Sequence, residues 1–341
     1  MISTLNIEEP SELLAYLIAT NRIRNKDNPK ITVLRGGVSN RTVHIEFENG
    51  ESWVLKQALT KLRVKGEWTS SPDRIFKEAE AMRWFDKHAP PNAVPKLIFE
   101  DQLHHLLAME AVKPPFDNLK GLLLTNPPES VYFKQAGELL GHIHQNGFKQ
   151  SNDIPKLFKD NHFFKTLRIE PYYIETIKAL PETASFLNEL TSETLEDRYT
   201  LVHGDYSPKN ILVKDSKLIL LDHEVIHFGD GTFDLGFFIC HLLSKSNHLP
   251  IHHQDFVNGV TEFYDSYLGV FTEMNKKREE RSVKHAIGCL LARVCGLSQL
   301  EYLTIDQQNK QKDIGLKLTK DQPKTIKELI LKFNQLSNAH N

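Results

Sequence analysis

Residues 203–213 read HGDYSPKNILV, and LLDHE follows at 220–224. The polar positions of this region stand between short apolar runs that suit β-strands. Asn210 comes five positions after Asp205, and Asp222 comes twelve positions after Asn210. A polar loop between buried strands is a common place for a functional site.

The two acids and the amide of this loop suit phosphoryl transfer from a nucleotide. That reaction needs a carboxylate that orients the accepting hydroxyl and takes its proton, and oxygen ligands that hold Mg²⁺ against the phosphates. The pattern H-x-D-x-x-x-x-N followed by a second aspartate supplies both. We therefore predict Asp205 as the catalytic residue, with Asn210 and Asp222 as the metal ligands.

The same region resembles the catalytic loop of the aminoglycoside phosphotransferase and choline kinase family, which are small-molecule kinases with a protein-kinase-like fold. Glycine commonly stands between the histidine and the aspartate in that family, as Gly204 does here. GDGTFDLG at 229–236 is similar to the family's G-D-P-x-x-D-L-A, with Gly231 in place of the usual proline. The resemblance covers residues 31–245. It implies ATP with two Mg²⁺ in a cleft, and a small hydroxylated substrate.

The resemblance also implies roles for residues around the loop. In kinase-like folds the histidine before the catalytic aspartate packs beneath the metal-binding loop, so we expect His203 to be structural and not a base. Asp234 resembles an aspartate that accepts hydrogen bonds from the backbone of the catalytic loop. Glu224 follows Asp222 by two positions, and either a contribution to the metal site or a place at its rim stays open.

The first third of the chain has the pattern of a small antiparallel sheet with one long helix. Asn49-Gly50 is the clearest hairpin signal in it, because both turn positions need positive φ. We expect strands at 31–34, 42–48 and 52–57, a helix at 72–88, and a hairpin of 94–100 with 104–110.

Two features of this expected sheet match the nucleotide-binding parts of the family. A glycine turn between the first two strands stands where such kinases place the loop that covers the phosphates, and glycines let backbone N–H groups approach phosphate oxygens. Lys56, on the next strand, matches the lysine that contacts the α- and β-phosphates. The residues of the turn that we expect at the phosphates are Gly36, Gly37, Ser39 and Asn40.

The lysine needs an acidic partner on the helix at 72–88. Glu78 shares the apolar stripe of this helix and agrees with the family pattern, whereas Glu80 groups with another face. Both glutamates stay open at this point. Glu110 and Val112 match the family's hinge, whose backbone pairs with the adenine edge.

We therefore predict an α+β protein with a two-lobed, protein-kinase-like fold. The N-lobe, an antiparallel sheet plus helix, covers residues 1–110, the hinge 111–115 and the mostly helical C-lobe 116–341. Helices of the C-lobe are expected at 130–146, 161–178, 182–196, 232–245, 253–273, 279–302 and 323–337.

Composition excludes several other classes of protein. Lys and Arg number 42 and Asp and Glu 44, a net charge of −2, so no strong field exists to bind nucleic acid or an anionic membrane. We find no signal peptide and no apolar run long enough to span a membrane. Three cysteines are too few for a disulfide framework. We expect a cytoplasmic protein without nucleic-acid or membrane partners.

Two other functions compete with that of a metabolite kinase. A catalytically inactive nucleotide-binding regulator is disfavoured because every polar position that the chemistry needs is intact. A protein kinase is disfavoured because no Phe-Gly follows Asp222 and no A-P-E occurs later.

The acceptor is less determined than the reaction. An aminoglycoside would need an acidic pocket, but residues 246–302 contain both acidic and basic side chains. Choline would need an aromatic cage, but the three tryptophans are in the N-lobe. An uncharged or anionic metabolite is preferred, and sugars, amino alcohols and amino acids stay open. Arg293, in an apolar helix, either faces an anionic partner in the cleft or forms a salt bridge within the C-lobe.

Overall fold

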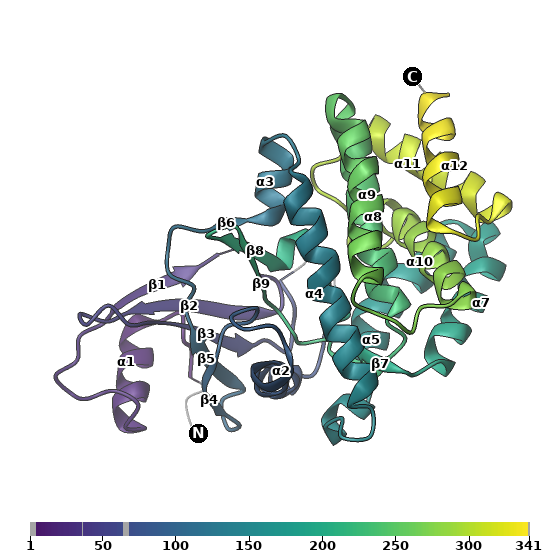
Figure 1. Cartoon of the computed structure of the whole chain (residues 1–341). Coiled ribbons are helices and arrows are strands. Elements are labelled where there is room, and N and C mark those ends of the chain that lie inside the picture. Colours follow the sequence, from purple (N-terminus) through teal and green to yellow (C-terminus); the bar gives the residue numbers. More distant parts are fainter. Residues whose placement is uncertain (1–4, 36, 64–67, 340–341) are drawn as a thin grey trace. The chain divides into compact units, whose positions relative to one another are not determined.

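Five strands of the first third of the chain form one antiparallel sheet in the computed structural model (Figure 1). The structure describes residues 5–35, 37–63 and 68–339. The elements of this part are α1 (Pro10–Ala19), β1 (Lys30–Leu34), β2 (Asn40–Glu46), β3 (Ser52–Ala58), α2 (Arg74–His88), β4 (Leu97–Asp101) and β5 (Leu106–Glu110). The strand order is β1-β2-β3-β5-β4. The predicted hairpin at Asn49-Gly50 is confirmed, because β2 pairs with β3 across it.

Side-chain alternation places one helix on each face of this sheet. Leu55 of β3 is buried in a cluster with Leu13 of α1. Its neighbour Val54 packs instead against Ile75 of α2. Because successive side chains of a strand point to opposite faces, α1 and α2 cover opposite faces. Lys56 lies two positions after Val54 and therefore faces α2.

The sheet and its helices belong to a unit of residues 1–87 and 94–116, while residues 88–93 and 117–341 form a second unit. The second unit is mostly helical, with one two-stranded sheet (β10-β7) and one three-stranded sheet (β6-β8-β9). Its strands are β6 (Asp117–Asn118), β7 (Thr200–Val202), β8 (Ile211–Lys214), β9 (Lys217–Leu220) and β10 (His227–Gly229). Its helices are α3 (Leu119–Thr125), α4 (Ser130–Lys149), η1 (Lys156–Lys159), α5 (His162–Phe164), η2 (Lys165–Ile174), α6 (Glu175–Ala179), η3 (Pro181–Thr183), α7 (Ala184–Glu196), η4 (Pro208–Asn210), α8 (Thr232–His248), η5 (Pro250–His252), α9 (His253–Leu268), α10 (Lys276–Cys295), α11 (Ile305–Asp321) and α12 (Ile326–Asn338).

α8 is the central helix of the second unit. Its residues from Thr232 to Asn247 are all buried, and it packs side by side with α9 and α10 (Figure 1). The apolar run at 235–243 therefore forms the interior of this unit. Among the residues that the structure describes, no helix has both the length and the apolar character needed to cross a membrane.

Most of the predicted helices are confirmed, with three differences. α9 ends at Leu268 and α10 at Cys295, earlier than predicted. The short helix α3 and the helix α11 were not predicted, and most residues of α11 are polar. The segment predicted at 161–178 is helical, but its central part, η2, is a π-helix that contains Pro171. π-helical turns are rare and are often found at functional sites.

Candidate active site

The predicted catalytic loop connects β7 to β8 in the second unit. It runs from His203 to Asn210 and ends in the short helix η4. Gly204 has φ of +77°, and a Cβ at this position would lie 2.8 Å from the side chain of Val225. Both the backbone angle and the close approach require glycine, which explains its place between the histidine and the aspartate.

The carboxylate of Asp234, in the first turn of α8, holds this loop through its backbone. Oδ2 accepts a hydrogen bond from the amide of His203 (2.7 Å) and Oδ1 from the amide of Gly204 (2.8 Å). Burial would raise the pKa of Asp234, but the hydrogen bond from His144 and the nearby imidazoles hold that pKa below its usual value. Asp234 is therefore a charged anchor for the loop, with the hydrogen bonds that the resemblance implies.

Asp234→Ala is expected to lower the melting temperature of the ligand-free protein. The change would leave two buried amide donors unpaired, at a cost of about 1–3 kcal/mol for each. Thermal melts without ligand measure this effect, with Asp313→Ala, at an exposed position of α11, as the control. An unchanged melting curve together with lost activity would instead give Asp234 a direct part in the reaction.

His203 is buried and connects the catalytic loop to the segment that carries Asp222. Its Nδ1 accepts from the amide of Asp205 (3.2 Å), so Nε2 carries the proton and donates to the carbonyl of Leu221 (3.2 Å). Burial lowers the pKa of His203 despite three nearby aspartates, and the ring is neutral at pH 7. Both ring nitrogens are used within the fold, which agrees with a structural role.

The carboxylate of Asp205 is held through one of its two oxygens. Oδ2 accepts from Nδ2 of Asn210 (2.7 Å) and lies 3.0 Å from Nη2 of Arg168. Oδ1 has no partner in the part of the chain that the structure describes, and the side chain is 16% exposed. The two contacts fix the carboxylate so that Oδ1 is the oxygen able to accept a proton from a substrate hydroxyl.

Arg168 is a site residue that the sequence analysis missed. It lies on η2, its Nε donates to the carbonyl of Gly204 (2.6 Å), and its Nη2 faces Asp205. Burial alone would lower the pKa of this guanidinium, but the charge of Asp205, with further acids that include Glu224, raises it. Glu224 is 7% exposed, so it lies within this charged group and not at a solvent rim. The only signal in the sequence is a charged residue between two apolar ones.

Strand pairing brings Asn210 and Asp222 together. β8 and β9 form a hairpin in which Ile211 pairs with Leu220, and the amide of Leu221 donates to the carbonyl of Asn210 (2.8 Å). Asp222 has φ of +67°, in the left-handed region that few residues other than glycine occupy. Such backbone strain is retained mainly at functional sites, and this supports the predicted role of Asp222.

The donor atoms of these two residues fit Mg²⁺, which prefers oxygen ligands. Nδ2 of Asn210 is bound to Asp205, so its amide oxygen is the atom left for a metal. No group of three or more His, Cys, Asp or Glu side chains suited to a metal occurs among the described residues. A metal at Asn210 and Asp222 would therefore need other ligands, such as the phosphate oxygens of a nucleotide.

Lys56 and Glu78 form an ion pair within the first unit. Nζ lies 2.6 Å from Oε1, and the glutamate side chain is 1% exposed. Glu80 pairs instead with Arg83, three positions along α2 (3.2 Å). The structure thus selects Glu78, because Lys56 and the inward stripe of α2 share one face of the sheet.

The glycine turn is held by an arginine that the sequence analysis also missed. Gly36 lies outside the described residues. Ser39 and Asn40 are buried, and Nδ2 of Asn40 donates to Oγ of Ser39 (3.2 Å). Arg74, fully buried at the start of α2, donates to the carbonyls of Ser39 and Leu59. Backbone N–H groups of the turn, more than these buried side chains, are the donors that we propose for a phosphate.

Glu110 ends β5, and Val112 follows that strand. The amide of Glu110 donates to the carbonyl of Lys96 (2.9 Å), and the amide of Ala111 donates to the carbonyl of Ser52 (2.9 Å). Both donors are used within the sheet. The carbonyl of Glu110 and the amide of Val112 are therefore the groups that we propose for an adenine edge.

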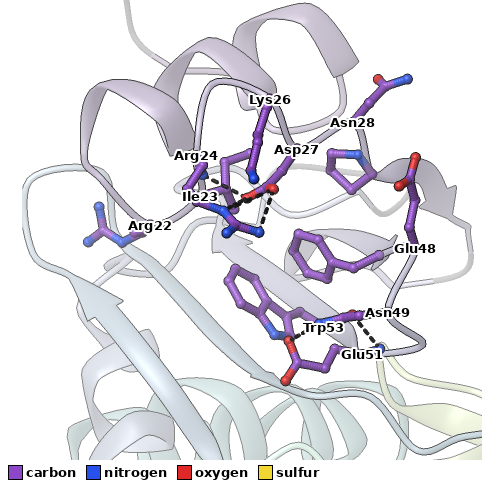
Figure 2. A pocket seen from close by; sticks show the side chains of 12 residues that line it. Arg22, Ile23, Arg24, Lys26, Asp27, Asn28, Glu48, Asn49, Glu51 and Trp53 are labelled. Atoms are coloured by element: carbon purple, nitrogen blue, oxygen red, sulfur yellow. Dashed lines mark hydrogen bonds and ion pairs between the residues drawn. The ribbon is translucent and has the colours of Figure 1, made fainter.

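The first unit also contains a pocket that the sequence did not predict (Figure 2). It encloses about 410 Å³ between the loop at 22–29 and the β2–β3 turn. Phe47 and Trp53 form its aromatic part, with ring centres 4.6 Å apart, and Arg24 pairs with Asp27 (3.1 Å) at another part of its wall. None of the predicted site residues that the structure describes lines this pocket.

Sequence comparisons place the chain among phosphotransferases. A protein-family model described as phosphotransferase enzyme family (APH) matches residues 30–259. Methylthioribose kinase 2 of Oryza sativa subsp. japonica is 23% identical over 268 residues, which cover 69% of this chain and 62% of that protein. The chain thus spans less than two thirds of the rice relative. A methylthioribose kinase of Bacillus velezensis is 23% identical over 355 residues, which cover 90% of this chain and 89% of that protein.

A comparison with solved structures agrees on the fold. An amicoumacin kinase in complex with AMP-PNP, Ca²⁺ and Ami matches with a TM-score of 0.58 and 15% identity, covering 86% of this chain and 89% of that one. The fold class predicted from the sequence, a protein-kinase-like α+β fold with a sheet unit and a mostly helical unit, is confirmed.

Proposed function

Because the chain belongs to the phosphotransferase enzyme family, we propose that it transfers the γ-phosphate of ATP to a hydroxyl group of a small molecule, with Mg²⁺ as the metal. The observation that carries this proposal is the carboxylate of Asp205, which is fixed through Oδ2 while Oδ1 has no partner among the described residues. The amicoumacin kinase of similar fold was solved with AMP-PNP and Ca²⁺, which supports a nucleoside triphosphate with a divalent cation.

Each residue of the site would have its own role in phosphoryl transfer. Asp205 orients the acceptor hydroxyl through Oδ1 and takes its proton during transfer. Asn210 and Asp222 would hold Mg²⁺, whose charge offsets that of the phosphates when it is bound. Lys56, fixed by its ion pair with Glu78, would contact the phosphates from the first unit.

The acceptor that we propose is a small hydroxylated metabolite of the sugar, amino alcohol or amino acid type. Relatives named methylthioribose kinases support a sugar-like acceptor. An aminoglycoside-modifying kinase is the alternative within the same family, and the cationic side chains of Arg168 and Arg293 near Asp205 disfavour it.

A screen for ATP consumption over a panel of metabolites tests the proposed function. We expect ADP release that requires Mg²⁺ and one class of hydroxylated acceptor, and that the Asp205→Asn variant loses. ADP release that the variant retains would remove Asp205 from the mechanism. Binding of ATP without turnover on any acceptor would favour a nucleotide-binding regulator.

Gly37→Ala is expected to weaken the use of ATP without lowering stability. An added Cβ would come no closer than 3.6 Å to the carbonyl of Asn40, so the fold itself tolerates a side chain there. If the amides of this turn bind phosphate, the methyl group should raise the KM for ATP about tenfold, the equivalent of one lost hydrogen bond. Steady-state kinetics and thermal melts measure the two effects.

Gly50→Ala is the matched control for this experiment, and the opposite result is expected. Gly50 has φ of +79°, so alanine there should lower the free energy of unfolding by about 1 kcal/mol and with it the melting temperature. The KM for ATP should stay unchanged. A Gly37→Ala protein with the wild-type KM would exclude this turn from phosphate binding.

A further inference from the structure

The guanidinium groups of two arginines of the second unit lie near the ring of one tyrosine, close to Asp205. The guanidinium groups of Arg168 and Arg293 lie 5.9 Å and 5.8 Å from the ring centre of Tyr172. Tyr172 is 4% exposed, and Arg168 also contacts Asp205 (3.0 Å). The ring of Tyr172 therefore connects Arg293 to the ion pair of Arg168 with Asp205, the predicted catalytic residue.

Two lysines lie in the same manner on a second tyrosine. The ammonium groups of Lys120 and Lys245 lie 5.9 Å and 5.5 Å from the ring centre of Tyr302. Arg293 acts electrostatically on this group too. Burial lowers the pKa of Lys245, and the charges of Lys120 and Arg293 lower it further, whereas burial raises the pKa of Tyr302 against the opposing charge of Arg293. The four cations come from α3, η2, α8 and α10. We call them the cationic cluster: Lys120, Arg168, Lys245 and Arg293.

In the part of the chain that the structure describes, two carboxylates offset two of these four charges. Asp205 pairs with Arg168, and Glu301 pairs with Lys120. The side chain of Glu301 is 67% exposed and that of Lys120 is 25% exposed. Solvent, and hence a ligand, can reach the cationic cluster at this end.

Among the described residues, Arg293 has neither a carboxylate partner nor a partner for its Nε. Its Nη1 contacts three acceptors, namely Oη of Tyr172 (3.3 Å), Oγ of Ser298 (2.6 Å) and the carbonyl of Ser298. Its buried Nε has no partner among the described residues. The salt bridge within the C-lobe, one of the two possibilities that the sequence left open, does not form in the part of the chain that the structure describes.

Lys245 is the most deeply buried member, with 1% of its surface exposed. Its ammonium makes one hydrogen bond within the described residues, at 3.5 Å to the carbonyl of His241, and no ion pair. Burial, together with the charges of Lys120 and Arg293, lowers the pKa of Lys245 to about 7. Lysine is almost never fully buried unless it is paired. The described residues provide no anionic partner for Lys245, so a bound anion would fill this role.

Tyr302 adds a second buried donor without a partner among the described residues, after Nε of Arg293. Its hydroxyl is buried and has no partner among the described residues, although its ring lies against both lysines of the cationic cluster. Unsatisfied buried polar groups are few in native proteins, and each needs an explanation such as an ion or ligand. Two such groups, Nε of Arg293 and the hydroxyl of Tyr302, lie beside the site together with the buried ammonium of Lys245, which has a single long hydrogen bond.

We propose that Lys245, Arg293 and Tyr302 bind an oxyanion of the phosphate acceptor, a carboxylate or a phosphate ester, while its hydroxyl reaches Asp205. The inference rests on the proposed function and narrows its acceptor to small hydroxylated anions. Glu301 holds Lys120 when no ligand is bound and competes with the oxyanion. A polycationic aminoglycoside would meet like charges at this place.

Lys245→Met and Glu301→Gln test the proposal with effects of opposite sign. Lys245→Met removes the charge but keeps the apolar stem, so the ligand-free melting temperature should not fall. The KM for an anionic acceptor should rise about 30-fold or more. Glu301→Gln should lower that KM, because it removes the competing carboxylate. Lys317→Met, the same change at an exposed position of α11, should alter nothing.

Acceptors with the same carbon skeleton but different charge distinguish the effect of charge on binding from the effect of shape. The first set is glycerol, glycerate and glycerol 3-phosphate, and the second is ribose, ribonate and ribose 5-phosphate, with kanamycin as the polycation. Calorimetry measures the binding of each compound, and ADP release with ATP and Mg²⁺ measures transfer. We expect one anionic member to bind at least about tenfold more tightly than its neutral counterpart, and the carboxylate and phosphate arms identify which oxyanion is preferred.

The outcomes distinguish this inference from the proposed function. Binding of an anion that Lys245→Met abolishes, without phosphate transfer to it, would support the anion site and contradict the proposed function. Transfer to neutral sugars or to kanamycin that Lys245→Met leaves unchanged would overturn the anion site and leave the proposed function standing. The inference is also wrong if no anionic member binds more tightly than its neutral counterpart.

Discussion

Asp205→Asn is expected to lower kcat by about 10³-fold while the protein stays folded and binds ATP. The wild-type carboxylate uses Oδ2 for both Asn210 and Arg168. The oxygen of an asparagine can accept both of these bonds, which places its NH₂ group where Oδ1 was. The variant thus keeps its internal contacts and presents a donor to the substrate hydroxyl, where the reaction needs a base.

Single-turnover and steady-state rates on the acceptor found by the screen measure this effect. Asp153→Asn, the same change at an exposed position, is the control and should keep the wild-type rate. Thermal melts with and without Mg-ATP show whether the variant is folded and binds nucleotide. A rate within about tenfold of the wild type would contradict a role for Asp205 as base, since general bases contribute about 10²–10⁴-fold.

The catalytic loop was predictable because its chemistry is local in the sequence. Asp205 and Asn210 are five positions apart, and the two apolar runs after them form a hairpin that returns the chain to Asn210 just before Asp222. Helix phase likewise favoured Glu78 over Glu80 as the partner of Lys56 but left both open, and the ion pair of Lys56 with Glu78 in the structure decides between them. Periodicity indicated which side chains share a face, whereas the roles of these residues came from the motif and from the resemblance to the kinase family.

The residues that surround the catalytic carboxylate could not be predicted in this way. Arg168 reaches Asp205 from a π-helix, whose occurrence depends on tertiary packing and not on a sequence period. Arg74 holds the glycine turn from the start of α2, and Lys245 is a buried cation in the interior of α8. From the sequence, each of these three residues would be predicted to lie at the surface, because charged side chains are normally exposed.

The missed helix α11 has a different physical cause. Its sequence is largely polar, so the apolar stripe that identifies an amphipathic helix is weak. Its start nevertheless carries a local signal. Thr304 and Gln307 form a capping box, a pattern that the sequence displays without any hydrophobic period.

Asp222→Asn is expected to abolish the stabilisation of the protein by ATP that depends on Mg²⁺. Asparagine is the sharper test than alanine, because Asp222 has φ of +67° and asparagine tolerates this conformation better than most residues. The substitution therefore removes the charge and one metal-binding oxygen with little change in the backbone. Asp215→Asn is the matched control, since Asp215 also has positive φ (49°) and lies at the tip of the neighbouring hairpin.

Thermal melts with ATP, with and without Mg²⁺, measure this prediction. A ligand present at 100 times its Kd stabilises a protein by about 2.7 kcal/mol, so the wild type and Asp215→Asn should melt at clearly higher temperature with both ligands than with ATP alone. Asp222→Asn should show no such difference, because Asn210 alone offers one neutral oxygen and Mg²⁺ binds mainly to charged carboxylates and phosphates. If the variant keeps the full response to Mg²⁺, then another residue holds the metal, and the strained backbone at Asp222 serves the fold and not the nucleotide.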